Sequence, residues 1–155
     1  MSLEYKVLRL NRSIKEYDQL IFRARILTIL TEVGLRFLSL KTTERIFAYF
    51  TKSVTPPDDK ETIVIIDKYS TLFKQMNDAS SLKGRCLSRS LVMRFLLSRK
   101  GISPELKIGI SQITGHLDVH AWLELDGVLI NDDPSVIINY TVLPFTKPTS
   151  IFKIK

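Results

Sequence analysis

The chain has 155 residues, the length of one ordinary domain, with 45% hydrophobic and 25% charged residues. These values are typical of a folded globular protein and exclude a disordered chain, a collagen-like fibre and a low-complexity scaffold. One cysteine cannot form an intramolecular disulfide and excludes a cysteine-rich zinc site, so we expect a cytoplasmic protein without a metal or other cofactor. The first ten residues carry three charges and therefore predict no signal peptide.

The net charge of +7 is unevenly distributed along the chain. Residues 82–107 hold seven basic residues and one acid, a balance of +6, whereas residues 111–147 hold five acids and one lysine, a balance of −4. A nucleic-acid binder usually interleaves aromatic residues with its basic stripe, and only Phe95 lies in this one. We therefore expect no nucleic acid among the partners.

Residues 1–52 predict a helical N-terminal segment. Thr42 or Thr43 is expected to cap its second helix, while residues 4–10 leave room for one short strand. Residues 26–40 are shorter than the roughly 20 apolar residues of a membrane span. Their helical spacing favours a helix packed in a core, with interfacial membrane binding through the N-terminal helices as the alternative. One face of the first helix is apolar and comprises Tyr17, Leu20, Ile21, Ala24 and Leu27.

A turn-rich connector at residues 53–59 separates this segment from a predicted core over residues 60–155, the two forming one compact unit. Asp58 and Glu61 have the spacing of a capping box at the start of a helix. After a loop over residues 77–85, a further helix is expected from Cys86 to about Lys100, ended by Gly101. The apolar face of the first of these two helices comprises Ile65, Ile66, Tyr69, Leu72, Phe73 and Met76.

The C-terminal third changes to the alternating pattern of strands. Residues 106–110 and 119–125 alternate, 128–131 form a short apolar run, and Asp126-Gly127 between the last two is a strong hairpin signal. Residues 135–143 and 149–154 are expected to form further strands. Helices followed by an antiparallel sheet predict the α+β class, with the sheet packed on the cysteine-bearing helix.

Cys86 is a candidate nucleophile because it begins an almost wholly apolar, hence buried, helix. The helix N-terminus brings a partial positive charge and free N–H groups to the sulfur, and Arg85 and Arg89 add full charges. Each of these favours thiolate over thiol. The competing interpretation is that a lone cysteine is an inert small hydrophobe.

A thiolate needs a base, and the chain has two histidines. His116 lies in a loop context and is expected to be a solvated surface residue. His120 lies in the strand pattern on the face of Trp122 and Glu124, where it is either a satisfied core residue or the base for Cys86.

The hairpin register leaves two aspartates open as the residue that orients the imidazole. A two-residue Asp126-Gly127 loop pairs residue 125 with 128 and sets His120 opposite Asp133, whereas a three-residue loop sets it opposite Asp132. Directly opposed residues lie about 4.5–5.5 Å apart at Cβ, so either carboxylate can reach the ring.

Six sequence blocks occur in a fixed order, at residues 86–91, 94–101, 106–110, 120–124, 126–127 and 131–132. Together they resemble one family, the transglutaminase-like leader peptidase of lasso-peptide biosynthesis. The blocks span residues 82–134, about a third of the chain, and the most specific one contains the His-Ala-Trp-Leu-Glu run at 120–124. The resemblance implies a transglutaminase-like, papain-like cysteine protease fold with Cys86 as nucleophile, His120 as base and Asp132 as orienting carboxylate.

The implied activity is removal of the leader from a ribosomally made precursor peptide through an acyl-enzyme. About 80 residues precede Cys86 and read as helices rather than as a winged-helix-like leader-binding module. We therefore expect the stand-alone peptidase of a split system, with a separate leader-binding protein and an ATP-dependent lasso cyclase as partners.

Two alternatives stay open: a transglutaminase-like acyltransferase, and a non-catalytic scaffold that docks a peptide partner. The second oxyanion donor also stays open among Gln75, Asn77 and Gln112, as do the precursor, its cleavage site and the oligomeric state.

Overall fold

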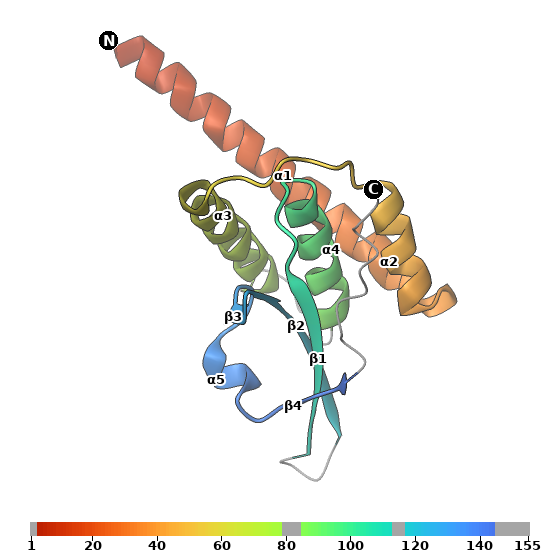
Figure 1. Cartoon of the computed structure of the whole chain (residues 1–155). Helices are drawn as coiled ribbons and strands as arrows, with labels where there is room; N and C mark the ends of the chain where they lie inside the picture. The colour runs from red at the N-terminus through yellow and green to blue at the C-terminus, as the bar shows by residue number, and fades with distance from the viewer. Residues whose placement is uncertain (1–2, 79–84, 113–116, 145–155) are drawn as a thin grey trace.

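The computed structural model describes residues 3–78, 85–112 and 117–144, without the side chains of 3–13 and 77–78. The strands form one antiparallel sheet in the order β3-β2-β1-β4 (Figure 1). The described helices are α1 (Leu3–Phe37), α2 (Leu40–Tyr49), α3 (Asp59–Asp78), α4 (Cys86–Ser98) and α5 (Pro134–Ile137). The described strands are β1 (Glu105–Ser111), β2 (Asp118–Leu125), β3 (Val128–Leu129) and β4 (Thr141–Val142). The predicted α+β architecture is confirmed.

Two sequence predictions for the N-terminal segment are wrong. Residues 4–10 belong to α1, so the short strand considered there does not form. The N-cap of α2 is Ser39 rather than Thr42 or Thr43, because the Ser39 hydroxyl accepts a hydrogen bond from the Thr42 N–H at 3.2 Å. Thr43 is instead buried, and its hydroxyl donates back to the Ser39 carbonyl at 3.2 Å.

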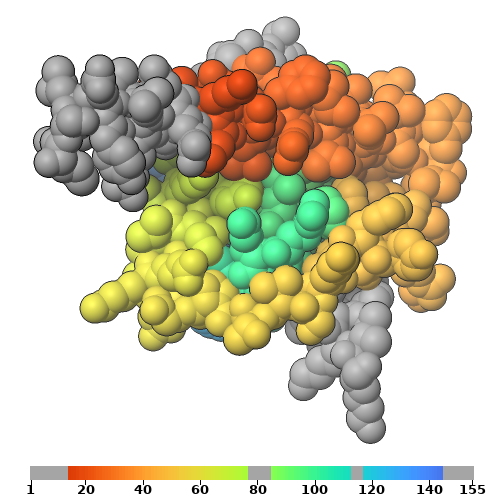
Figure 2. Space-filling view, turned by 90° about the horizontal axis from the view of Figure 1, so that it is seen from above, coloured from red at the N-terminus to blue at the C-terminus, as the bar shows by residue number. Residues whose placement is uncertain are grey.

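The face of α1 that contains Ala24 packs into the core, as its spacing predicts, and Ala24 is fully buried. The segment 26–40 is only half in that core, because its outer side is apolar and exposed. Within this segment Leu30 is 61% exposed and Phe37 82%, and Phe22, on the same outer side just before it, is 66% exposed. Figure 2 shows α1 crossing one side of the molecule. Among the described residues, no helix is sufficiently long and apolar to cross a membrane.

α3 begins as the sequence predicts, with the Asp58 carboxylate accepting the Glu61 N–H at 2.8 Å. α4 is the central helix of the core and packs between α1, α3 and the sheet (Figure 1). Its buried residues meet one face of β2 at Ala121 and Leu123. The fully or almost fully buried apolar residues of α4 are Leu91, Val92, Met93 and Leu97.

The expected strand over residues 135–143 is wrong for most of its length. Asp133 caps a short helix, α5, by accepting hydrogen bonds from the Ser135 N–H at 2.8 Å and the Ser135 hydroxyl at 2.6 Å. Only Thr141 and Val142 then form a strand, β4, which pairs with β1 at the opposite edge of the sheet from β3. The strand expected over residues 149–154 lies outside the described residues.

Candidate active site

Cys86 is the first residue of α4, so its sulfur lies where the helix presents unpaired N–H groups. The thiol contacts the Val119 carbonyl of β2, with 3.9 Å between Sγ and O. Burial raises the pKa of the Cys86 thiol, but hydrogen bonds from His120 and from the Ala121 and Leu87 N–H groups more than offset this. The pKa therefore lies below its ordinary value, and the thiolate is favoured.

His120 and Asp132 form a short hydrogen bond, with 2.6 Å between Nε2 and Oδ2. Their side chains are 16% and 17% exposed, so water screens the pair only weakly. The hydrogen bond to Asp132, followed by that to Cys86, raises the pKa of His120 to about 9. The ring is therefore an imidazolium at neutral pH, and its Nδ1 is left for the Cys86 sulfur.

Asp132 stays ionised in this arrangement. Burial raises the pKa of its carboxyl, but hydrogen bonds from His120 and from the Asp133 N–H, together with the charges of His120 and Arg89, lower it below the ordinary value. The site therefore combines a thiol with a lowered pKa, an imidazole with a raised pKa and an ionised carboxylate, an arrangement that suits nucleophilic attack followed by proton donation.

The structure brings together Cys86, His120 and Asp132, although its hairpin has the register that would set Asp133 rather than Asp132 opposite His120. The hairpin closes with a two-residue loop, since Leu125 pairs with Val128, and both loop residues have positive φ (Asp126 50°, Gly127 80°). Continued regular pairing would set Asp133 opposite His120. Asp132 meets the ring instead because β3 ends at Leu129 and the chain turns away.

Because the chain turns away after β3, the neighbouring edge of β2 is hydrogen-bonded by side chains rather than by another strand. The Ile130 N–H still donates to the Leu123 carbonyl at 3.0 Å. The Leu123 N–H then donates to Asn131 Oδ1 at 2.7 Å, and Asn131 Nδ2 donates to the Ser90 hydroxyl at 2.9 Å. Ser90 in turn donates to the Ala121 carbonyl at 3.0 Å. Sequence reasoning missed the role of Ser90 and Asn131, although both lie in blocks that carry the family resemblance.

An aromatic wall covers the other side of His120. The Tyr140 ring lies 5.4 Å from the imidazole and the Trp122 ring 6.2 Å, measured between centroids. The Tyr140 hydroxyl donates to Asp118, and this bond raises its pKa to about 12, so it stays protonated. Gly109 on β1 leaves room for the wall, because a Cβ there would lie 2.7 Å from Trp122. Tyr140 was not predicted to be near the site, because residues 135–143 were expected to form a strand.

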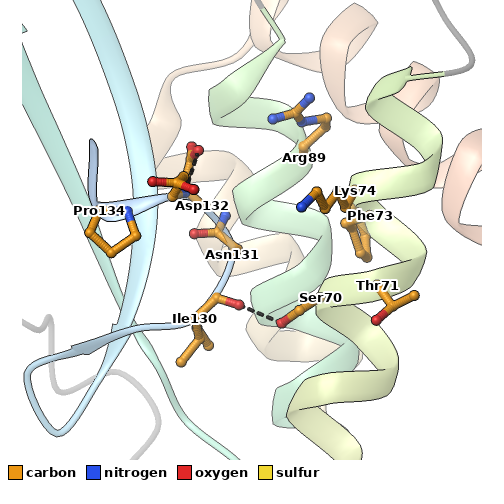
Figure 3. Close-up of a pocket in the computed structure, with 10 residues that line it drawn as sticks. Ser70, Thr71, Phe73, Lys74, Arg89, Ile130, Asn131, Asp132 and Pro134 are labelled. Atoms are coloured by element: carbon orange, nitrogen blue, oxygen red, sulfur yellow. Dashed lines mark hydrogen bonds between the residues drawn. The ribbon is translucent and has the colours of Figure 1, made fainter. Parts of the chain in front are cut away.

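A pocket of about 320 Å³ lies next to Asp132, between α3, α4 and the segment after β3. Figure 3 shows Lys74 and Arg89 reaching toward Asp132 from α3 and α4, with Ser70 tied to the Ile130 carbonyl. The pocket is lined by charged side chains, including Lys74 and Arg89, and by apolar side chains such as Phe73 and Pro134. It can therefore hold polar and apolar parts of a peptide.

Several sequence candidates remain unplaced or apart from the site. His116 and the side chain of Asn77 lie outside the described residues. The Gln75 amide oxygen accepts the Tyr17 hydroxyl at 3.1 Å, and Gln112 follows the end of β1. Within the described part of the chain, no group of three or more His, Cys, Asp or Glu residues could hold a metal ion.

Comparison with known proteins adds one match to this geometry. The family model described as the transglutaminase-like superfamily matches residues 29–144, which begins inside α1 and includes all three site residues. No curated protein matches the chain, and no solved structure does.

Proposed function

This chain belongs to the transglutaminase-like superfamily, and from that premise we propose that it is a cysteine endopeptidase that cuts the leader from a lasso-peptide precursor. The superfamily includes cysteine peptidases and acyltransferases. The observation that carries the enzymatic part is the contact of Cys86 with His120, whose other nitrogen lies 2.6 Å from Asp132. An inert core cysteine has no need of a lowered pKa or of a carboxylate behind the histidine.

In the proposed reaction, the Cys86 thiolate attacks the carbonyl carbon of the last leader residue. The Cys86 backbone N–H supplies one donor to the oxyanion. The His120 imidazolium gives its proton to the departing amine, which becomes the N-terminus of the core peptide, and a thioester remains. His120 then takes a proton from water, the hydroxide attacks the thioester, and the leader leaves as a carboxylate while the Cys86 thiolate is regenerated.

The first test is Cys86→Ala with a leader–core precursor peptide, read by mass spectrometry. The change removes the nucleophile and little packing, so cleavage should disappear while far-UV circular dichroism stays that of the unchanged chain. Cleavage above a tenth of the unchanged rate would remove Cys86 from the mechanism. Absence of any precursor gene beside this one would contradict the lasso-peptide assignment without touching the hydrolase chemistry.

The acyltransferase alternative has the same first half-reaction and differs in what accepts the acyl group. Adding a primary amine to the assay separates the two, because a hydrolase releases the free leader acid and a transferase releases the amide. The scaffold alternative predicts a thiol that reacts with iodoacetamide only near the free-thiol pKa of about 8.5. The one cysteine in the chain makes that readout unambiguous.

The split-system proposal adds a separate leader-binding protein. It is supported by the outer side of α1, where Phe22, Leu30 and Phe37 are more than half exposed, since apolar patches of this kind mark interaction sites. The exposed cations Arg23, Arg25 and Arg36 flank this stripe, so the docking face of the partner should be apolar with an acidic rim. An ATP-dependent cyclase would then act on the released amine.

The partner test compares precursor cleavage by the full chain with and without the leader-binding protein. We expect slow cleavage alone and stimulation by the partner, and we expect Phe22→Ser/Phe37→Ser to lose the stimulation but not the basal rate. Ile63→Ser/Val64→Ser is the matched control, because both residues are 67% exposed on α3. Full activity of the isolated chain at low micromolar precursor would refute the split system.

A further inference from the structure

The edge of β2 next to the site is held by side chains. On one side β2 pairs with β1 from Asp118 to Glu124, but on the other β3 reaches only Glu124 and Leu125. The backbone between Val119 and Leu123 therefore presents N–H and C=O groups that need other partners, since an unpaired buried backbone group is costly. Two of these partners are Ser90 and Asn131, which we call the edge clasp.

The clasp ties three separate segments together. Ser90, 1% exposed, comes from the second turn of α4 and binds the Ala121 carbonyl of β2. Asn131 comes from the turn after β3, accepts the Leu123 N–H at 2.7 Å and donates to Ser90 at 2.9 Å. Each of these segments also carries one residue of the site. Cys86 lies four positions before Ser90, His120 one position before Ala121, and Asp132 one position after Asn131.

Each half of the clasp reaches a different part of the site. Ser90 fixes Ala121 through its carbonyl, and the N–H of the same residue donates to the Cys86 sulfur. Asn131 fixes the residue directly before Asp132, whose carboxylate lies on His120. Deleting either side chain would therefore release one ladder-like bond and let one member of the site move.

We propose that Ser90 and Asn131 are positioning residues, which set the spacing of Cys86, His120 and Asp132 by replacing the missing strand at the edge of β2. The inference extends the proposed function to two residues that touch neither the substrate nor the reacting atoms. It rests on that function only for the effect on turnover, because the reactivity of the thiol can be measured without a substrate.

The test is the rate of Cys86 alkylation by iodoacetamide against pH in the full chain, with Ser90→Ala and Asn131→Ala. Ser98→Ala is the matched control: Ser98 is a buried serine of the same helix, 6% exposed, whose hydroxyl has no hydrogen-bond partner within the described residues. Other charged or titratable groups that interact with the triad are Arg89 and Tyr140, the latter hydrogen-bonded to Asp118, and all three stay unchanged in every variant.

The rate of alkylation should have two pH midpoints, the lower of which reports the Cys86 thiol. We expect Ser90→Ala to raise this lower midpoint by half a pH unit or more, toward the free-thiol value of about 8.5. Asn131→Ala should instead lower the alkaline midpoint that reports His120. Both should lower kcat about tenfold or more with KM little changed, because a misplacement of about 1 Å costs up to about 10²-fold. The double variant should lose more than either single one but less than the product of the two losses, since the hydrogen bond between Asn131 and Ser90 couples them while each also fixes a different part of the site.

Wild-type midpoints and turnover in both clasp variants would overturn the proposal, as would an equal effect of Ser98→Ala. Thermal unfolding of each variant separates a change in the position of the site residues from a change in stability. A clasp variant that only lowers Tm, with its alkylation midpoints unchanged below Tm, also counts against the proposal. If one single variant does not fold, the other decides, because each deletes a different partner of the same bond. Failure of peptide cleavage in the unchanged chain would contradict the proposed function and leave the alkylation result standing.

Discussion

The two neighbouring aspartates after β3 give the sharpest test of the site, because one binds the imidazole and the other caps a helix. Asp132 lies 2.6 Å from His120 Nε2, and both side chains are largely buried. Asp133 points away and binds Ser135. Changing each in turn therefore separates a mechanistic carboxylate from a structural one of the same type and almost the same sequence position.

Asp132→Ala should lower kcat/KM by at least about 10²-fold. A hydrogen bond to a charged group contributes about 1.5–3 kcal/mol, and the upper half of that range corresponds to about 10²-fold in rate at about 1.4 kcal/mol per factor of ten. Loss of the equivalent carboxylate in a serine-protease triad costs about 10⁴-fold. A cysteine enzyme should lose less, because the thiolate and imidazolium can form as an ion pair before attack.

Asp133→Asn should stay within a few-fold of the unchanged rate, because asparagine caps a helix about as well as aspartate. The assay is initial-rate precursor cleavage by mass spectrometry, with Cys86 alkylation against pH as the second readout. Asp132→Ala removes the main cause that holds the pKa of His120 at about 9, so its alkaline midpoint should fall, while that of Asp133→Asn should not. The reverse ranking of the two variants would refute the assignment of Asp132.

Two further predictions concern stability. In Cys86→Ala, where the thiol no longer contributes, the free energy of unfolding should fall as pH rises. In this variant the hydrogen bond to Asp132, the largest cause, still raises the pKa of folded His120 above the value of about 6.5 in the unfolded chain. Its contribution is therefore complete below about pH 6.5 and is lost as the pH rises through the folded pKa; urea titrations that show a rise in the free energy of unfolding across this range would contradict the His120–Asp132 pair. Gly109→Ala should cost about 1–3 kcal/mol by overpacking, since its Cβ would lie 2.7 Å from Trp122 and 2.9 Å from Tyr140, whereas Gly34→Ala, with nothing within 4 Å, should not lower Tm.

Local signals carried most of the correct predictions. The capping pair Asp58 and Glu61, the apolar face of α3 and the hairpin at Asp126-Gly127 depend on residues within one or two turns of each other, so the sequence contains their whole cause. The helix α5 was missed although Asp133 before Pro134 is a local cap signal. The β-branched, apolar residues that follow favoured a strand and outweighed it.

The partner of His120 could not be derived from local signals, because it depends on where β3 stops. After that point Asn131 takes the place of a strand residue, and its amide binds Ser90, 41 positions earlier in the chain. Hairpin rules assume that pairing continues, and here β3 ends at its second residue, Leu129. The family resemblance identified Asp132, whereas the register argument left Asp132 and Asp133 equally possible.

The early end of β3 also explains how Cys86 and His120 can meet at all. The body of α4 packs on the Ala121 and Leu123 face of β2, whereas His120 lies with Trp122 on the opposite face. A helix on one face of a continuous sheet cannot reach a side chain on the other, because the neighbouring strand lies between them. Since β2 has no strand beside it at this point, the first turn of α4 extends past the edge and its thiol contacts the Val119 carbonyl. A longer β3 that continued its pairing to residue 119 would place backbone between sulfur and imidazole, so the early end of this strand is what lets the two side chains meet.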